Sequence, residues 1–499
     1  MAQFVWFDAG SRGRLLLVLH HLVVDGVSWR VLLPDLAAAW VRVRAGVPVE
    51  LPGVVTSARR WAHALVEEAA GAARVAELGF WQGVLEGPDP VLGARRPDPS
   101  VDTMGTVETV RVEVPVSVTQ GLLRGIPAAF RGGMNDGLLA ALAMAVARWR
   151  GGDEKSLLVR LEGHGREEGV VPGADLSRTV GWFTSMFPVR LDLSGFDLGE
   201  VFAGGGAVGG VVKAVKEQLL SVPDKGLGYG LLRYLNAETG GVLAGYPEPQ
   251  VGFNYLGRFS VADMPEELRG LGWSQVLDVD DAGAVFDGDM PVMSALEINA
   301  YVTDTAEGPR LDALFSFPRG VFGEGEVREL VRWWRVALGV LAEYVGRPGA
   351  GGLTPSDVPL VSVGQGQLVE WERVCPGLRD VWPLTPLQSG LLFHSRFVES
   401  AVDVYQVQLV FHLSGRVESG RLRAAGQGLL ERYANLRSAF VAYAGGWVQL
   451  VAEGVELPWR EVDLRDLPEG ERAEALEGVL AGDRVDRFDP GSAPLLRLM

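Results

Sequence analysis

Two adjacent histidines, followed by an aspartate and a glycine, are the residues of this sequence best suited to acid/base chemistry. They lie in the run HHLVVDG (residues 20–26), directly after the apolar segment 14–19. Such a segment is typical of a buried strand, and neighbouring strand residues point to opposite faces, so one histidine at most faces a given cavity. Histidine has an ordinary pKa of about 6.5, which suits proton transfer near neutral pH. Taken alone, the run also fits a structural histidine pair capped by Asp25.

Five further motifs follow the histidine run in a fixed order. With the extension VSWR (27–30), the set resembles the signatures of epimerization domains of nonribosomal peptide synthetases, which belong to the condensation superfamily and share the chloramphenicol acetyltransferase-like fold. The resemblance covers residues 1–350, and one position departs from it, since Arg258 stands where the family usually has glutamine. The five motifs are DGLLAAL (136–142), EGHGRE (162–167), RTVGWFT (178–184) with Pro188, KGLGYG (225–230) and FNYLG (253–257).

The resemblance implies a reaction and a set of catalytic groups. The family inverts the α-carbon of an aminoacyl or peptidyl thioester held on the phosphopantetheine arm of a carrier protein. Inversion needs one group to remove the α-proton and another to return a proton to the opposite face. The resemblance implies that His21 and Glu162 are these groups, and that Tyr255 donates to the thioester oxygen as charge develops there. For each residue a structural role remains open: a strand-end cap, a surface carboxylate or a core tyrosine.

Other residues of the motifs are expected to shape the site. Four are predicted to line the tunnel for substrate and pantetheine: Ser28, Trp29, Thr184 and Asn254. Four are predicted to be structural at the site: His20, Asp25, Gly26 and Arg166, with Arg166 as the ion-pair partner of Asp25. The remaining histidines lack the spacing of metal ligands, so no metal site is expected.

The elements that must position these residues alternate between strands and helices. Strands are predicted at 14–19, 106–114, 156–161, 251–255, 295–302 and 312–317, and helices at 30–44, 57–85, 135–149 and 324–344, with a mainly helical region at 201–235. This alternation indicates a mixed α/β (α+β) fold rather than a helical bundle or a β-sandwich.

The C-terminal region resembles the beginning of a condensation domain. It carries WPLTPLQSGLLFHS (382–395) and YANLRSAF (433–440), and it ends without an HHxxxDG run of its own. We therefore expect a chain truncated at both ends. Its predicted parts are the remainder of an epimerization N-lobe (1–120), an epimerization C-lobe (121–345), a Gly- and Pro-rich linker (346–380) and the N-terminal part of a condensation domain (381–499).

Composition and charge exclude several function classes. The net charge of −17 argues against nucleic acid, because duplex binding relies on clustered lysine and arginine. There is no apolar run of membrane-spanning length and no signal-peptide pattern. The single cysteine, Cys375, fits a reducing compartment. We therefore predict a cytoplasmic protein without a membrane or nucleic-acid partner.

The function predicted from the sequence is L-to-D epimerization of a carrier-tethered thioester by two-base proton transfer. The chain is expected to bind no cofactor itself, because the phosphopantetheine arm would come from an upstream peptidyl carrier domain. The other expected partner is the downstream remainder of the condensation domain. Two alternatives stay open: a condensation domain that forms peptide bonds by acyl transfer, and a catalytically incomplete interaction fragment.

Overall fold

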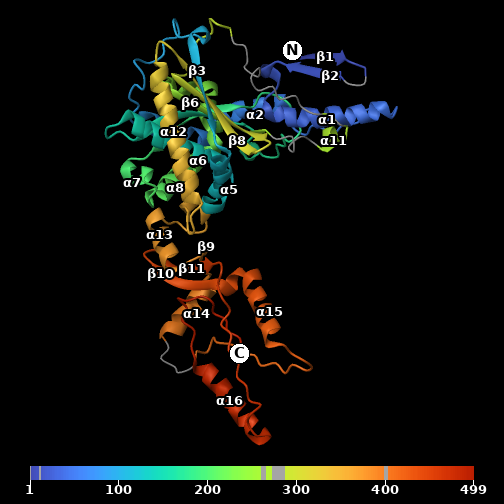
Figure 1. Cartoon of the computed structure of the whole chain (residues 1–499), viewed down its shortest axis with the longest axis vertical. Helices are drawn as coiled ribbons and strands as arrows, with labels where there is room; N and C mark the ends of the chain where they lie inside the picture. The colour runs from blue at the N-terminus through green and yellow to red at the C-terminus, as the bar shows by residue number, and fades with distance from the viewer. Residues whose placement is uncertain (1, 11–12, 260–265, 272, 274–286, 398–402) are drawn as a thin grey trace. The chain divides into compact units, whose positions relative to one another are not determined.

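The computed structural model describes the chain except residues 1, 11–12, 260–265, 272, 274–286 and 398–402 (Figure 1). It divides into two compact units, Met1–Gly351 and Gly352–Met499, which are described separately. Among the described residues, no helix is long and apolar enough to cross a lipid bilayer.

A six-stranded mixed sheet forms the centre of the first unit. Its strand order is β3-β8-β7-β6-β4-β5, in which β6 is parallel to both β4 and β7, and the other neighbours are antiparallel. Neighbouring β4, β6 and β7 can therefore bring side chains from distant parts of the sequence into one row. The strands are β3 (Val107–Val114), β4 (Ser156–Gly163), β5 (Ser185–Asp192), β6 (Val251–Phe259), β7 (Leu296–Thr305) and β8 (Gly308–Pro318).

Helices cover one face of this sheet and create the main hydrophobic core. In α6 (Met134–Arg150), residues 137–147 are all buried, and their many alanines allow the helix to approach the strands closely. Beside α6 lies α12 (Glu324–Val345), whose Trp334 is fully buried and donates its indole N–H to the Leu138 carbonyl over 3.4 Å. Figure 1 shows α5 (Val116–Phe130) and α8 (Ala207–Leu220) in the same layer. The opposite sheet face is left to carry polar side chains.

The N-terminal elements lead the chain to the histidine run. Strands β1 (Ala2–Asp8) and β2 (Gly13–Leu19) form an antiparallel hairpin. After a short 3₁₀ turn, α1 (Gly26–Arg44) begins earlier than predicted, because Asp25 caps its first turn by accepting the Ser28 N–H. The helical region expected at 57–85 is divided, with Gly71 in extended conformation between the first two pieces. The pieces are α2 (Ala58–Ala69), α3 (Ala72–Val75) and α4 (Leu78–Glu86).

The lobe boundary predicted at residue 120 is wrong. Strand β3 pairs along its whole length with β8, from Val107 opposite Pro318 to Val114 opposite Leu311. Those hydrogen bonds make β3 an edge strand of the large sheet, although it precedes residue 120 in the chain. The transition between the two parts of this unit therefore lies before Val107.

The segment between β5 and β6 consists mostly of short helices. The region expected to be helical at 201–235 is indeed helical in most of its length. It consists of α7 (Leu198–Phe202), α8, α9 (Leu227–Gly230) and a π-helical turn (Leu231–Leu235), followed by α10 (Ala237–Ala244) and α11 (Glu266–Gly270).

The second unit has its own small sheet and core. Three antiparallel strands in the order β10-β11-β9 pack against the helix α13. The linker predicted at 346–380 is wrong from residue 353 onward, because Leu353, Val358, Leu368 and Trp371 are buried in this core. The elements are α13 (Gln365–Val374), β9 (Leu378–Pro383), α14 (Pro386–Phe397), α15 (Ser419–Arg432), β10 (Ser438–Tyr443), β11 (Gly446–Ala452) and α16 (Glu469–Val485).

Candidate active site

The two histidines of the predicted motif have different environments. His20 has an extended backbone, and its Nδ1 accepts the Leu22 N–H over 3.1 Å, which caps the 3₁₀ turn that follows β2. His21 is exposed, and its ring lies 5.1 Å from the Trp182 ring at an angle of 59°. The imidazole of His20 is therefore engaged in a local hydrogen bond, whereas the imidazole of His21 is accessible to a substrate.

Glu162 lies near the end of β4, on the sheet face opposite the helices. Leu161 pairs with Phe253 of the parallel strand β6, so Glu162 lies beside Asn254. The Asn254 Nδ2 donates to the Glu162 Oε2 over 2.9 Å. The Asn254 amide thus fixes the orientation of the Glu162 carboxyl group, and the tunnel role of Asn254 stays a prediction.

The surroundings of Glu162 favour its protonated form. Part of the side chain reaches solvent, but the protein around it removes much of its hydration, and this desolvation raises the pKa of Glu162 above its ordinary value. The negative charge of Glu297 raises this pKa further, while Arg160 and His21 lower it. The Trp182 ring that contacts His21 is three residues before Ser185, which pairs with Gly163 next to Glu162, so one short segment links the two predicted acid/base groups.

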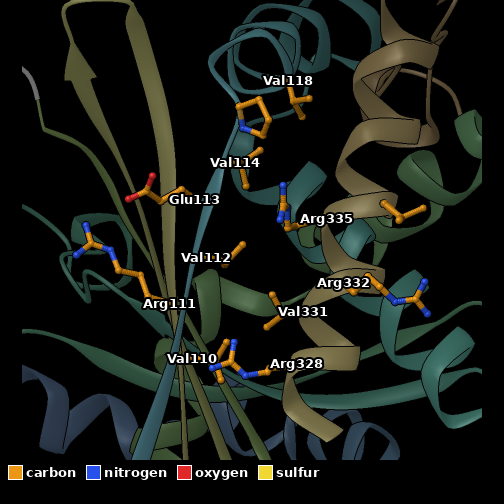
Figure 2. Close-up of a pocket in the computed structure, with 12 residues that line it drawn as sticks. Val110, Arg111, Val112, Glu113, Val114, Val118, Arg328, Val331, Arg332 and Arg335 are labelled. Atoms are coloured by element: carbon orange, nitrogen blue, oxygen red, sulfur yellow. The ribbon is translucent and has the colours of Figure 1, made fainter. Parts of the chain in front are cut away.

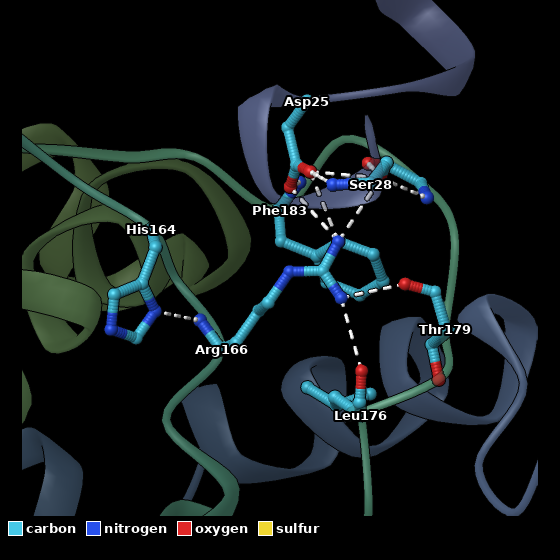
Figure 3. A network of polar contacts seen from close by, with 8 residues as sticks. Asp25, Ser28, His164, Arg166, Leu176, Thr179 and Phe183 are labelled. Atoms are coloured by element: carbon cyan, nitrogen blue, oxygen red, sulfur yellow. Dashed lines mark hydrogen bonds and ion pairs between the residues drawn. The ribbon is translucent and has the colours of Figure 1, made fainter. Parts of the chain in front are cut away.

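Asp25 is the centre of a buried polar network (Figure 3). Its carboxylate is only 4% exposed and accepts the N–H groups of Ser28 over 2.7 Å and Phe183 over 3.2 Å. The Arg166 Nη2 donates to both carboxylate oxygens, over 3.0 and 3.2 Å. The ion pair predicted between Asp25 and Arg166 is therefore present, and it connects the start of α1 with the segment between β4 and β5.

Arg166 also holds the loop that carries Trp182. Its Nη1 donates to the Leu176 carbonyl over 3.1 Å and to the Thr179 carbonyl over 2.6 Å. Its guanidinium carbon lies 4.1 Å from the centre of the Phe183 ring, and Figure 3 shows the two side chains next to each other. One arginine thus fixes both the aspartate that follows the histidines and the loop whose tryptophan contacts His21.

Acid should weaken this network. Burial alone would raise the pKa of Asp25, but the hydrogen bonds from Ser28 and the charge of Arg166 hold it below the ordinary value of 3.8. A lowered pKa in the folded state contributes stability above the ordinary pKa, and this is lost as pH falls through the folded pKa. We therefore expect the urea midpoint of Asp25→Asn to depend less on pH below about pH 4 than that of the unchanged chain. Equal pH dependence of the two chains would contradict this.

Ser28 does not line a tunnel, and that prediction is wrong. Its side chain is 0% exposed, and its hydroxyl donates to the Asp25 Oδ1 over 2.8 Å while accepting from the Arg166 Nη2 over 3.1 Å. Ser28 lies in the first turn of α1, where its side chain points to the buried Asp25 carboxylate. Gly26 is the first residue of α1, as its predicted structural role requires. Trp29 and Thr184 are half-buried near this network, and their tunnel role stays a prediction.

Tyr255 is not brought to the face that carries Glu162. Successive residues of a strand point to opposite faces, and the neighbouring Asn254 bonds Glu162. The Tyr255 side chain packs instead against the main hydrophobic core together with Phe253, and burial raises its pKa. The predicted donation from Tyr255 to a thioester oxygen at Glu162 is therefore not supported by this placement.

Three residues of the site were missed by the sequence analysis. Trp182 forms a wall beside His21, and its position within the RTVGWFT motif was the available signal. Arg160 and Glu297 lie on the sheet face of Glu162 and form an ion pair of 2.8 Å. Arg160 could have been found from its spacing of two from Glu162 on one strand. Glu297 could not, because the order of the strands is not visible in the sequence.

Two other features of the described residues concern possible metal ligands and a surface groove. In the described part of the chain, no group of three or more histidine, cysteine, aspartate or glutamate side chains could hold a metal ion. A groove of about 640 Å³ lies between the edge strand β3 and α12 (Figure 2). Valines and arginines line this groove, and none of the predicted site residues is among them.

Comparison with known proteins identifies the family of the chain. The family model described as "Condensation domain" matches residues 2–290 and 378–499. The chain belongs to the condensation-domain family. This membership confirms the mixed α/β, chloramphenicol acetyltransferase-like fold predicted from the motifs.

Similar proteins include a linear gramicidin synthase and a tyrocidine synthase. The condensation-family chain is 36% identical, over its full length, to one of the linear gramicidin synthase proteins of Brevibacillus parabrevis, and spans 6% of that protein. It is 31% identical over 72% of its length to tyrocidine synthase 1 of the same organism, of which the match spans 32%. The solved epimerization domain from the third module of tyrocidine synthetase B is similar with a TM-score of 0.55 and 30% identity, covering 68% of this chain and 72% of that one.

Proposed function

We propose that the first unit is an epimerization domain of a nonribosomal peptide synthetase, which inverts the α-carbon of an aminoacyl or peptidyl thioester from L to D. The observation that carries this proposal is the convergence of two proton carriers from distant parts of the sequence. His21 follows β2 and Glu162 lies near the end of β4, and the segment that leads into β5 links them. Its Trp182 contacts the His21 ring, and Ser185 pairs with Gly163, the neighbour of Glu162. Similarity to a solved epimerization domain supports the same conclusion.

The proposed reaction proceeds by two proton transfers. One group takes the α-proton, and the electron pair of the broken C–H bond moves into an enolate with negative charge on the thioester oxygen. The other group then gives a proton to the opposite face of the α-carbon, which restores the thioester with inverted configuration. For the reverse direction His21 and Glu162 exchange roles, as microscopic reversibility requires.

The environment of Glu162 suits it to both roles. Its Oε2 accepts from Asn254, whereas no described residue bonds its Oε1, so Oε1 is available to the substrate. Desolvation and Glu297 raise the pKa of Glu162, so a larger fraction of the group carries a proton near neutral pH. A carboxyl group with such a pKa can donate to a carbanion and can be restored by removing a proton from the other enantiomer.

The substrate and its delivery follow from the same proposal. The thioester would arrive on the phosphopantetheine arm of an upstream peptidyl carrier domain, and the chain itself would need neither cofactor nor metal. The D-configured product would pass to the downstream condensation domain, whose N-terminal part the second unit resembles. The names of relatives as gramicidin and tyrocidine synthases support a role in assembling a peptide antibiotic.

Peptide-bond formation is the second candidate, because the matching family model is that of condensation domains. Acyl transfer to an amine needs one base beside the attacking nitrogen and has no need for a second proton carrier across the substrate. The position of Glu162 therefore favours epimerization. A site with the histidine motif but without a second proton carrier would have favoured condensation.

A two-substrate assay separates these functions. The full chain is incubated with an L-aminoacyl carrier, with and without a second aminoacyl carrier as acceptor, and the products are hydrolysed and resolved by chiral chromatography. Epimerization predicts a mixture of D- and L-amino acid that does not depend on the acceptor. A dipeptide formed only with the acceptor, and without D-amino acid, would establish condensation instead. The absence of both products would indicate an interaction fragment and would contradict the proposal.

A further inference from the structure

We propose that Arg160 and Glu297 form a positioning pair for Glu162, and that the pair can form across β6 because Gly252 has no side chain. This inference rests on the proposed function, since it concerns how Glu162 is prepared for proton transfer. Arg160, Glu297 and Gly252 all lie outside the sequence motifs that define the site.

The three residues form one row across three neighbouring strands. Arg160 of β4 is opposite Gly252 of β6, and Gly252 is opposite Glu297 of β7. Glu162 and its partner Asn254 lie two residues further along β4 and β6, on the same sheet face. The row of Arg160, Gly252 and Glu297 is therefore directly next to the row of Glu162 and Asn254 on the same sheet face.

The ion pair bridges a strand rather than joining direct neighbours. The Arg160 Nη2 donates to the Glu297 Oε2 over 2.8 Å, and the Arg160 Nη1 donates to the Met293 carbonyl over 3.2 Å. Arg160 is only 9% exposed, so its charge is held in a fixed position and is weakly screened by solvent. Two opposite charges are thereby fixed next to Glu162.

Glycine is required at position 252 because the Glu297 carboxylate comes close to the backbone there, and not because the backbone angles need glycine. A Cβ atom at this position would lie 2.2 Å from the Glu297 Oε2 and 2.5 Å from its Oε1. Any side chain on this part of β6 would push the Glu297 carboxylate out of the space between β4 and β7. The glycine thus leaves room for a carboxylate above the strand, where it meets Arg160.

The pair acts on Glu162 through two opposing charges. Glu297 raises the pKa of Glu162 and Arg160 lowers it, and both are close because they lie in the adjacent row. Removing either member leaves the other charge uncompensated beside the proposed acid. A merely structural pair would not produce changes of opposite sign when its two members are removed in turn.

The test is a ¹³C NMR titration of the full chain labelled at glutamate carboxyl carbons, with the Glu162 signal assigned by its loss in Glu162→Gln. Glu297→Gln should lower the pKa of Glu162, and Arg160→Gln should raise it. Gly252→Ala should act like Glu297→Gln, because it displaces the carboxylate. Glu324→Gln, which removes an exposed ion pair with Arg328 on α12, is the matched control and should cause no shift.

Activity is measured in the same variants, so that the two proposals can fail separately. The acidic limb of the pH profile for α-proton exchange should move in the direction of the Glu162 titration. Shifts of equal sign, or no shift in folded Glu297→Gln and Arg160→Gln, would overturn the positioning pair even if exchange is observed. Opposite shifts in a chain without any exchange would support the pair and contradict the proposed epimerization.

Discussion

Glu162→Gln is expected to slow α-proton exchange of a carrier-bound aminoacyl thioester by about 10²–10⁴-fold, the usual contribution of a general acid or base. Glutamine keeps the size of the side chain and can still bond Asn254, but it cannot carry the proton. His21→Gln should cause a loss of similar size, because each face of the α-carbon needs its own carrier. Exchange is measured by mass spectrometry of the hydrolysed amino acid after incubation in D₂O.

Matched controls separate this effect from general damage to the protein. His63 is an exposed histidine on α2, and Glu324 forms an exposed ion pair on α12. His63→Gln and Glu324→Gln should exchange at the rate of the unchanged chain. Full exchange from both enantiomers by Glu162→Gln would show that the two-base scheme is wrong.

Arg166→Met is expected to lower the free energy of unfolding by about 3–5 kcal/mol, the usual cost of removing one member of a buried ion pair. The Asp25 carboxylate would remain buried without its charged partner, and the carbonyl groups of Leu176 and Thr179 would lose their donor. The backbone N–H groups of Ser28 and Phe183 report on the change directly, because both donate to Asp25. Their protection against hydrogen exchange should fall with the stability.

An exposed arginine provides the control for this substitution. Arg328→Met removes a surface pair with Glu324, for which the expected loss is at most about 0.5 kcal/mol. Urea unfolding is followed together with hydrogen exchange, because a chain of two units need not unfold in a single transition. A loss for Arg166→Met no larger than that for Arg328→Met would contradict the role given to the Asp25 network.

The parts of the site that were predictable lie within single motifs. Resemblance of the motifs to those of a known family was enough to select His21 and Glu162 as candidates, and the ion pair expected between Asp25 and Arg166 is present. Sequence could also have corrected one error, because Asn254 and Tyr255 are neighbours on a strand and cannot both face one cavity. Ser28 was misplaced for a different reason: whether the first turn of a helix faces a tunnel or a buried carboxylate depends on tertiary packing.

The fold shows the same division between local and long-range information. Long periodic segments such as α12 were predicted within a residue of their ends. The pairing of β3 with β8, far apart in the sequence, was not predictable, and the lobe boundary was misplaced as a result. The Gly- and Pro-rich composition after residue 346 indicated a linker, but composition does not reveal that Leu353 and Val358 are buried.

The most direct test of the central claim is isotope exchange from both enantiomers. L- and D-aminoacyl thioesters on a phosphopantetheine carrier are incubated separately with the full chain in D₂O, and deuterium at the α-carbon is followed together with configuration. Two-base epimerization predicts that both substrates gain deuterium and converge on the same mixture of enantiomers, because His21 and Glu162 each serve one face. Thioesters that keep their configuration and their α-protons, in a chain whose Asp25–Arg166 network is intact by hydrogen exchange, would contradict it.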